Sequence, residues 1–192
     1  MKHLKLFFAL LATLALGVTN ALAEEWNHTF KSGETVSNNA ITVDGSTWNI
    51  TTTLGAGSPT ISTVTYSKVY GLKFGSSKSS YYSSVVFSTD YFNNYNVSKI
   101  VVKILLNGGV STTLTTKQGD VTIGTSSFSK AQTWTELTTN TSKGSNGQLS
   151  FAINTTQAFY ISSITVEYEI PSSGSGGTKP ANCLIPKNTV FG

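Results

Sequence analysis

The chain of 192 residues has no arginine, one cysteine (Cys183) and only one histidine beyond residue 23, His28. Arginine is the usual side chain for bidentate phosphate recognition, and histidine is the most frequent general acid or base in catalysis. One cysteine excludes a disulfide within this sequence and leaves either an intermolecular bridge or an idle thiol. We therefore expect no enzyme activity, and we expect His28 to be an edge or surface residue.

Charge is also scarce, since only 11% of the residues are Asp, Glu, Lys or Arg. The formal net charge is +4, and it falls to +2 when Lys2 and Lys5 are left out. The lysines are scattered and form no basic block, so no nucleic-acid partner is expected. Glu167 and Glu169 share one strand face, where we interpret them as exposed charges that limit strand pairing rather than as a catalytic pair. A nearly neutral surface suits an uncharged ligand such as a polysaccharide.

Residues 1–23 have the pattern of a secretory signal peptide. Two lysines precede the apolar run 6–18, and Ala21-Leu22-Ala23 fits the cleavage rule for small residues. We therefore predict cleavage after Ala23 and a secreted or cell-surface protein. The apolar run is short for a membrane span and no second one follows, so the mature chain should have no span. We expect it to be a monomer.

Strand signals fill the rest of the chain, because β-branched and aromatic runs alternate with Gly, Asn and Ser clusters and no helical periodicity is sustained. This pattern predicts an all-β fold, a two-sheet antiparallel β-sandwich with jelly-roll (galactose-binding-like) topology; a partly open barrel is the alternative. The predicted strands are 27–31, 40–43, 47–53, 60–66, 69–75, 84–89, 98–106, 111–117, 120–124, 133–139, 148–154 and 158–170.

Alternation within the strands predicts which side chains face the core. In segment 158–170, Tyr160, Ile164 and the later even-numbered residues share one face, whereas Phe159 and Ile161 begin the other. Segment 100–106 is apolar on both faces apart from one lysine, which predicts a central strand.

The module is expected to occupy residues 24–170. The Ser/Gly-rich residues 171–177 have the composition of a flexible linker. Residues 178–192, which include Cys183, are too few for a domain, and we interpret them as a tail or as the start of a truncated further domain.

Four structural motifs carry a resemblance to a known family. They are the aromatic and threonine strand 26–30, the Trp-x-Ile-x-Thr strand 48–52, the Gly-Leu-x-x-Gly-Ser-Ser turn 71–77, and the Ala-x-Tyr-Ile-x-Ser-Ile-x-Val-x-Tyr segment 158–168. The chain resembles the jelly-roll β-sandwich accessory module of secreted Bacteroidetes and Firmicutes proteins. The resemblance implies a non-catalytic module, often appended to nucleases, glycan-acting enzymes or surface proteins. It supplies no binding residues.

Aromatic side chains give the leading functional hypothesis, because sugar rings stack on Trp and Tyr while polar neighbours bond the hydroxyls. Two predicted loops carry them: Tyr81-Tyr82, and residues 91–96 with Tyr91, Asn94 and Tyr95. These loops flank strand 84–89 and should lie at its opposite ends, so they do not easily form one site. The alternative is that Tyr82 and other aromatic residues only cover the ends of the sandwich.

Trp134 is the first choice for a binding residue. It alternates with Glu136 and Thr138, opposite Leu137, so we expect its indole on an exposed sheet face. The sequence thus favours a carbohydrate-binding module, or one that positions a downstream domain. A structural spacer or adhesin domain, and the N-terminal accessory part of a secreted nuclease or glycosidase, remain the alternatives.

No cofactor is predicted, since the sequence has no His/Cys cluster and no calcium-loop motif. A structural calcium ion stays open. Asp44, Asp90, Asp120 and Glu136 are available as ligands, and no pattern selects among them.

Overall fold

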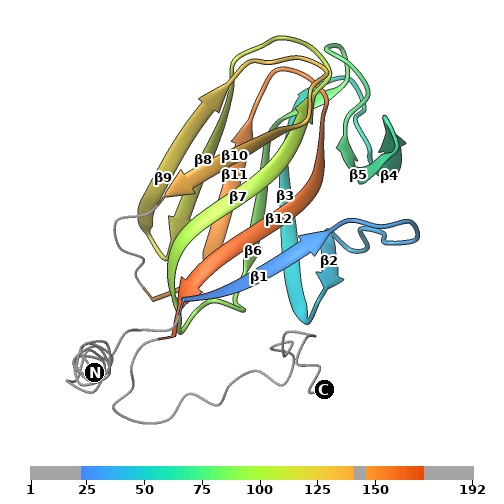
Figure 1. Ribbon diagram of the computed structural model, residues 1–192. Helices are drawn as coiled ribbons and strands as arrows, with labels where there is room; N and C mark the ends of the chain where they lie inside the picture. The colour runs from blue at the N-terminus through green and yellow to red at the C-terminus, as the bar shows by residue number, and fades with distance from the viewer. Residues whose placement is uncertain (1–22, 141–145, 171–192) are drawn as a thin grey trace, which may run out of the picture.

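A computed structural model describes residues 23–140 and 146–170, which form twelve β-strands and no helix (Figure 1). Residues 1–22 of the predicted signal peptide 1–23, the linker 171–177 and the tail with Cys183 lie outside the described residues. Within the described ranges, no helix is long and apolar enough to cross a membrane.

Each of the twelve strands overlaps one predicted segment. The largest differences are at β1, which begins four residues early, and at β9, which ends four residues late; β6 begins three residues early and includes Tyr81 and Tyr82. The strands are β1 (Ala23–Thr29), β2 (Ala40–Val43), β3 (Ser46–Ala56), β4 (Ile61–Tyr66), β5 (Val69–Phe74), β6 (Tyr81–Thr89), β7 (Asn96–Leu106), β8 (Thr112–Gln118), β9 (Val121–Phe128), β10 (Thr135–Asn140), β11 (Leu149–Asn154) and β12 (Phe159–Glu169).

The strands form two antiparallel sheets of six. Sheet A has the order β10-β7-β12-β5-β4, and β1 pairs with β12 beyond the end of β5. Sheet B has the order β2-β3-β6-β11-β8-β9. From β5 to β8 every connection crosses from one sheet to the other, which is the winding of a jelly roll. The predicted fold class is confirmed, and β7 is an interior strand as expected.

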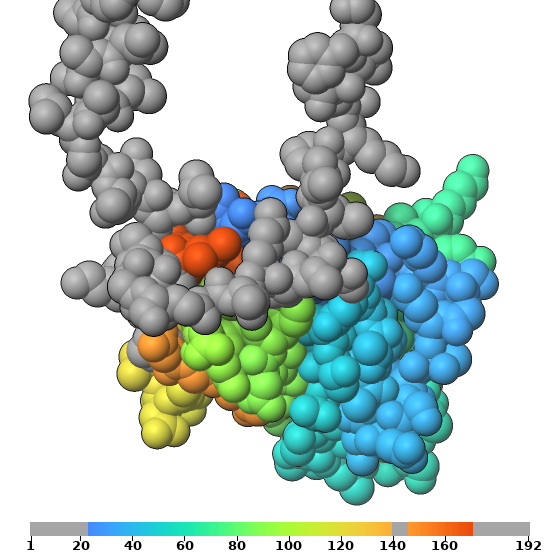
Figure 2. Space-filling view, turned by 90° about the horizontal axis from the view of Figure 1, so that it is seen from below, coloured from blue at the N-terminus to red at the C-terminus, as the bar shows by residue number. Residues whose placement is uncertain are grey.

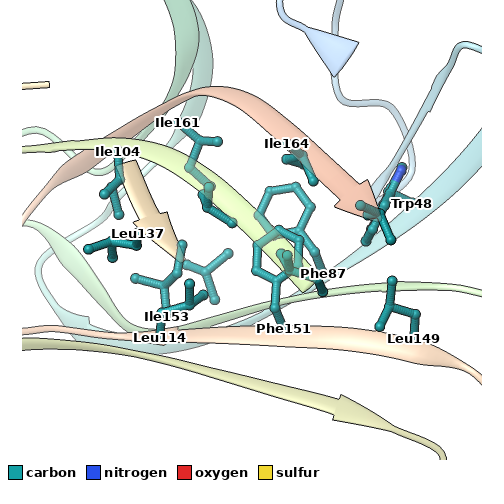
Figure 3. Packing of buried hydrophobic residues seen from close by; sticks show 14 of the residues in the cluster. Trp48, Phe87, Ile104, Leu114, Leu137, Leu149, Phe151, Ile153, Ile161 and Ile164 are labelled. Carbon is teal, nitrogen blue, oxygen red and sulfur yellow. The ribbon is translucent and has the colours of Figure 1, made fainter. Parts of the chain in front are cut away.

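The core lies between the two sheets and is rich in aromatic rings. Phe87 of β6 and Phe151 of β11 stack with ring centroids 4.8 Å apart, and Trp48 of β3 lies 5.6 Å from Phe151 (Figure 3). All three side chains are fully buried. Without a disulfide among the described residues, burial of this aromatic and aliphatic surface is the main source of stability.

A β-bulge in β12 overturns one predicted face. The register shifts between Ile161 and Ser163, so that one extra residue changes the phase of the alternation. Phe159, Ile161 and Ile164 all lie in the core, and Figure 3 shows the last two together there. The prediction that Tyr160 shares a face with Ile164 is wrong, because the bulge directs Tyr160 away from the core.

The two glutamates of β12 also differ from expectation. β12 is an interior strand between β7 and β1, so these charges do not guard a sheet edge. Glu167 is paired, since the Lys99 Nζ donates to its Oε1 over 2.5 Å. This contact is the first cause of a pKa of Lys99 above its usual value.

Candidate functional site

One row of side chains crosses the outer face of sheet A, the face directed away from sheet B. Tyr160 of β12 is in register with Leu105 of β7 on one side and with Lys73 of β5 on the other. Trp134 immediately precedes Thr135, which pairs with the residue before Leu105, and therefore continues the row. We call these four residues the outer row.

Trp134 is half-buried rather than exposed, and it lies just before β10 rather than within the strand. Its indole covers the backbone of β5: a Cβ atom on Gly71 would lie 3.4 Å from the Trp134 Cη2 and 2.6 Å from the Ile161 carbonyl oxygen. The lack of a side chain at Gly71 thus leaves room for both the indole and β12. Leu105 is 1% exposed and Tyr160 8% although both face outward, so neighbouring side chains on this face cover most of their surface.

The predicted alternation of exposed and buried residues after Trp134 is confirmed. Leu137 is buried, whereas Glu136 and Thr138 are exposed. The indole of Trp134 is less exposed than predicted because it lies against the sheet, over Gly71, instead of pointing into solvent.

A second tyrosine joins Tyr160 from the neighbouring hairpin. The rings of Tyr66, at the end of β4, and Tyr160 have centroids 5.5 Å apart and are tilted by 43°. The turn between β4 and β5 consists of Ser67 and Lys68, with φ of 50° and 67°. Two positive φ values define the type I′ turn that a two-residue hairpin requires, here without glycine. This tight turn sets Tyr66 at the end of its strand, beside Tyr160.

Two buried polar atoms near the outer row have no hydrogen-bond partner among the described residues. They are the Trp134 Nε1 and the Oγ of Ser162, the bulge residue of β12. The other two such atoms, on Trp48 and Asn93, lie in the core and in the turn after β6. An unsatisfied buried polar group costs about 1–3 kcal/mol, so a site that tolerates two of them is a candidate for supplying their partners by ligand binding.

The charges around the outer row are mainly positive. The Lys73 Nζ lies 5.7 Å from the centroid of the Tyr160 ring. Lys103, one row further along β7, pairs in register with Ser163 and Glu136. Both lysines are half-buried, and neither forms an ion pair with a described residue.

The other tyrosines proposed from the sequence lie elsewhere and mostly pack on the core. Tyr81 and Tyr82 are strand residues of β6 and not loop residues, because β3 pairs with them through a bulged register. The Tyr82 hydroxyl donates to the Pro59 carbonyl over 2.9 Å, and burial raises the pKa of this hydroxyl above its usual value. The Tyr81 ring lies over Gly55, where an added Cβ would come within 2.3 Å of it.

Tyr91 and Tyr95 follow the far end of β6, so the prediction of two separate ends is confirmed. The ring of Tyr91 contacts Phe92 edge-on with centroids 4.9 Å apart, and Tyr95 lies 4.9 Å from Tyr168. Both pack against the core cluster, whereas Asn94 is exposed in the turn between them. None of these residues is near the outer row.

His28 is a buried residue, 2% exposed, and the expectation of a surface histidine is wrong. Its Nδ1 lies 2.6 Å from the Asp44 Oδ2 and its Nε2 lies 3.0 Å from the Glu34 Oε2. The His28 ring thus joins β1 to the segment before β2 and to the β2–β3 turn.

The proposed calcium ligands do not converge. Within residues 23–140 and 146–170, no three His, Cys, Asp or Glu side chains gather in a way that could hold a metal ion. Asp44 is bound to His28, and the Asp90 Oδ1 accepts from the amides of Asn93 and Gln148. Calcium therefore has no assigned site.

Sequence reasoning named Trp134 as a candidate but not Tyr66, Tyr160 and Lys73, which share its sheet face. The sequence did contain a signal for the outward direction of Tyr160. The apolar residues Phe159 and Ile161 are odd-numbered, whereas the apolar residues from Ile164 onward are even-numbered, so the two sets fall on opposite faces of a regular strand. Only a bulge at the Ser162-Ser163 doublet lets both apolar sets face one core. Tyr66 and Lys73 depend on strand register, which the sequence does not specify.

No protein-family model and no curated protein matches the sequence significantly. Solved structures similar to this chain include a family 29 carbohydrate-binding module from Piromyces equi, with a TM-score of 0.43, 8% identity and coverage of 76% of this chain and 90% of that one. Another is the CBM36-1 domain of a multidomain xylanase from the hindgut metagenome of Trinervitermes trinervoides, with a TM-score of 0.38, 13% identity and coverage of 68% and 99%.

A third similar structure is the GH26-CBM35 β-(1,4)-mannanase of Podospora anserina, with a TM-score of 0.43 and 13% identity; the match covers 79% of this chain and 29% of the mannanase. Because all three TM-scores lie below 0.5, a function for this chain has to be argued from its own side chains.

Proposed function

We propose that this chain is a non-catalytic module that binds carbohydrate on the outer face of sheet A, at the outer row and Tyr66. One observation carries the proposal. Three aromatic side chains from separate segments, Trp134, Tyr160 and Tyr66, lie on one sheet face instead of in the core, Tyr66 against Tyr160 and Trp134 over Gly71, and two polar atoms without described partners lie near them.

The chemistry of these groups suits a sugar. The C–H faces of a pyranose ring pack against aromatic rings, and hydroxyl groups both donate and accept hydrogen bonds. The Trp134 Nε1 can only donate, whereas the Ser162 Oγ can donate or accept. Both atoms are buried in the free module, so a sugar whose hydroxyls bond them has to displace the side chains that cover them, and it then removes the cost of leaving them unpaired.

Binding without hydrolysis follows from the composition of the outer row. Glycoside hydrolysis uses two carboxyl groups on either side of the bond, about 5–10 Å apart. The row consists of Trp134, Leu105, Tyr160 and Lys73, which can stack and donate hydrogen bonds but cannot act as that pair. Glu136, in register with Lys103 one row away, is one carboxylate near the row, whereas Glu167 lies towards the other end of β12 and is bound to Lys99.

We further propose that the module works outside the cell, as the predicted signal peptide implies, and holds a domain beyond the linker 171–177 near its glycan. A nuclease or glycosidase there would make this the accessory part of a larger enzyme. A spacer or adhesin role competes with this proposal and predicts that no polysaccharide is retained.

Affinity electrophoresis of the full chain through gels with soluble polysaccharides, together with pull-down on insoluble ones, tests the proposal. We expect retardation in at least one polymer and its loss in Trp134→Ala. Tyr81→Ala is the matched control, because it removes a half-buried aromatic ring from sheet B, and it should be retarded like the wild type. Equal mobility of wild type and Trp134→Ala in every polymer would refute the proposal and favour the spacer.

A further inference from the structure

The distribution of charge around the outer row names the class of glycan. We infer that the ligand is an acidic polysaccharide whose uronic acid carboxylates bind Lys73 and Lys103. The inference rests on the proposed function and adds the ligand class of the same site.

Lys73 is the first part of the evidence. It stands in register with Tyr160, is half-buried, and holds its ammonium 5.7 Å from the centre of the Tyr160 ring. A cation within about 6 Å of a ring centroid is held there by the ring quadrupole. The ammonium is thus held beside the aromatic rings of the proposed site, where it can meet a charged group carried on a bound sugar.

Lys103 is the second part. It lies on the same face, two strands from Lys73 and one row away, which places their Cα atoms about 12 Å apart. Lys68 adds a third positive charge at the hairpin tip next to Tyr66. A linear polyuronate carries a carboxylate on each residue, so one chain crossing the strands can reach both Lys73 and Lys103.

The two ends of the outer face of sheet A differ in charge. At the end with the outer row lie Lys68, Lys73 and Lys103, and Glu136, which is in register with Lys103, makes no ion pair with them among the described residues. At the other end Lys99 is bound to Glu167, and Glu25 and Glu169 add negative charge. The net charge of the chain is therefore close to neutral although the charge at the aromatic site is positive. A charged ligand fits this site better than the uncharged ligand expected from the net charge.

The chemistry favours a carboxylate over a hydroxyl as the partner. A lysine ammonium offers three donors and no acceptor, and its hydrogen bonds to an ionised group are roughly twice as strong as those to a neutral one. A neutral sugar would take water from two half-buried ammonium groups without returning an opposite charge. The chain has no arginine, so lysine is its only permanent side-chain cation.

The test compares each acidic polymer with its own neutral form. Polygalacturonate, alginate and glucuronoxylan are run in affinity gels with the full chain, beside the carboxyl-reduced form of each polymer. We expect at least one acidic polymer to bind at least tenfold more tightly than its reduced form, and to lose this advantage between 20 mM and 500 mM NaCl. Heparin serves as a sulfated arm and should bind more weakly than the best polyuronate.

Three variants complete the test. Lys73→Met should weaken binding to the acidic polymer about tenfold, Lys73→Arg should retain most of it, and the matched control Lys117→Met, on the outer face of sheet B, should leave it unchanged. Thermal unfolding of each variant confirms that it is folded.

The outcomes separate the two proposals. Tight binding of reduced and acidic forms alike, still lost in Trp134→Ala, overturns the inference and leaves the proposed function standing. Heparin binding that exceeds all polyuronates also overturns it, as does equal loss in Lys117→Met and Lys73→Met. Failure of every polymer, acidic or neutral, overturns both.

Discussion

Gly71 is the residue at which stability and the proposed site are most directly coupled. In Gly71→Ala the new Cβ would lie 2.6 Å from the Ile161 carbonyl oxygen and 3.4 Å from the Trp134 Cη2. The first distance is shorter than a van der Waals contact, so β5 and β12 have to move apart. They pair through only three residues on each strand, Phe159–Ile161 with Leu72–Phe74, so the ladder has little capacity to absorb the shift.

The magnitude follows from two opposing effects. Overpacking of a tight contact costs about 1–3 kcal/mol. The smaller conformational entropy of alanine in the unfolded chain returns about 0.4–1 kcal/mol. We therefore expect Gly71→Ala to lower the free energy of unfolding by about 1–2 kcal/mol, which corresponds to a Tm lower by about 2–8 °C for a domain of this size.

Calorimetry and acrylamide quenching of tryptophan fluorescence measure the two effects. Trp26 and Trp48 are buried, so a rise in quenching reports on Trp134 leaving the sheet. Gly109→Ala is the control: its added Cβ would lie 3.4 Å from the nearest atom, and it should keep the wild-type Tm. A Gly71→Ala variant that melts like Gly109→Ala, with unchanged quenching, would show that the contact between Gly71, Trp134 and β12 is wrong.

Three further outcomes are expected. Phe151→Ala should lower the free energy of unfolding in urea by about 3–5 kcal/mol because it empties a stacked core position, whereas Phe151→Leu should cost less than about 1.5 kcal/mol; equal losses would contradict the packing. His28→Leu should lower the free energy of unfolding by about 1–3 kcal/mol. This loss is smaller than for breaking a fully buried pair because Asp44 is 51% exposed, and adding Asp44→Asn to the same chain should recover part of it. Burial raises the pKa of Tyr82, so the folded state favours the neutral phenol and this contribution to stability is lost as the pH rises above 10.0. Tyr82→Phe should therefore lose less stability between pH 9 and pH 11 than the wild type. Equal losses in the two proteins would count against a buried Tyr82 hydroxyl.

Strand positions could be predicted from the sequence because alternation and turn residues are local signals. Fold class followed from the number of strands, and β2 was predicted to the residue. The pairing of β1 with β12 and the crossing of strands between sheets depend on contacts between distant segments, so only the fold type and not the strand order could be expected.

The candidate site was predictable only in part. Trp134 was a candidate from the sequence because its neighbours Glu136 and Leu137 alternate cleanly, and its role in binding stays a prediction. Tyr160 was assigned to the wrong face since strict alternation has no place for the bulge at Ser162. His28 was assigned to the surface because its partners, Asp44 and Glu34, come together only in the folded chain.

The antiparallel pairing of β1 with β12 has a consequence for how the module is tethered. Ala23 pairs with Glu169, so the chain enters and leaves the sandwich at one point, where Figure 2 shows the blue of β1 next to the orange-red of β12. Tyr160 lies near the opposite end of β12, about 30 Å away at the rise of an extended strand. A domain attached at either end would therefore be held at the far pole from the aromatic row, which leaves the proposed ligand face free to meet an extended surface.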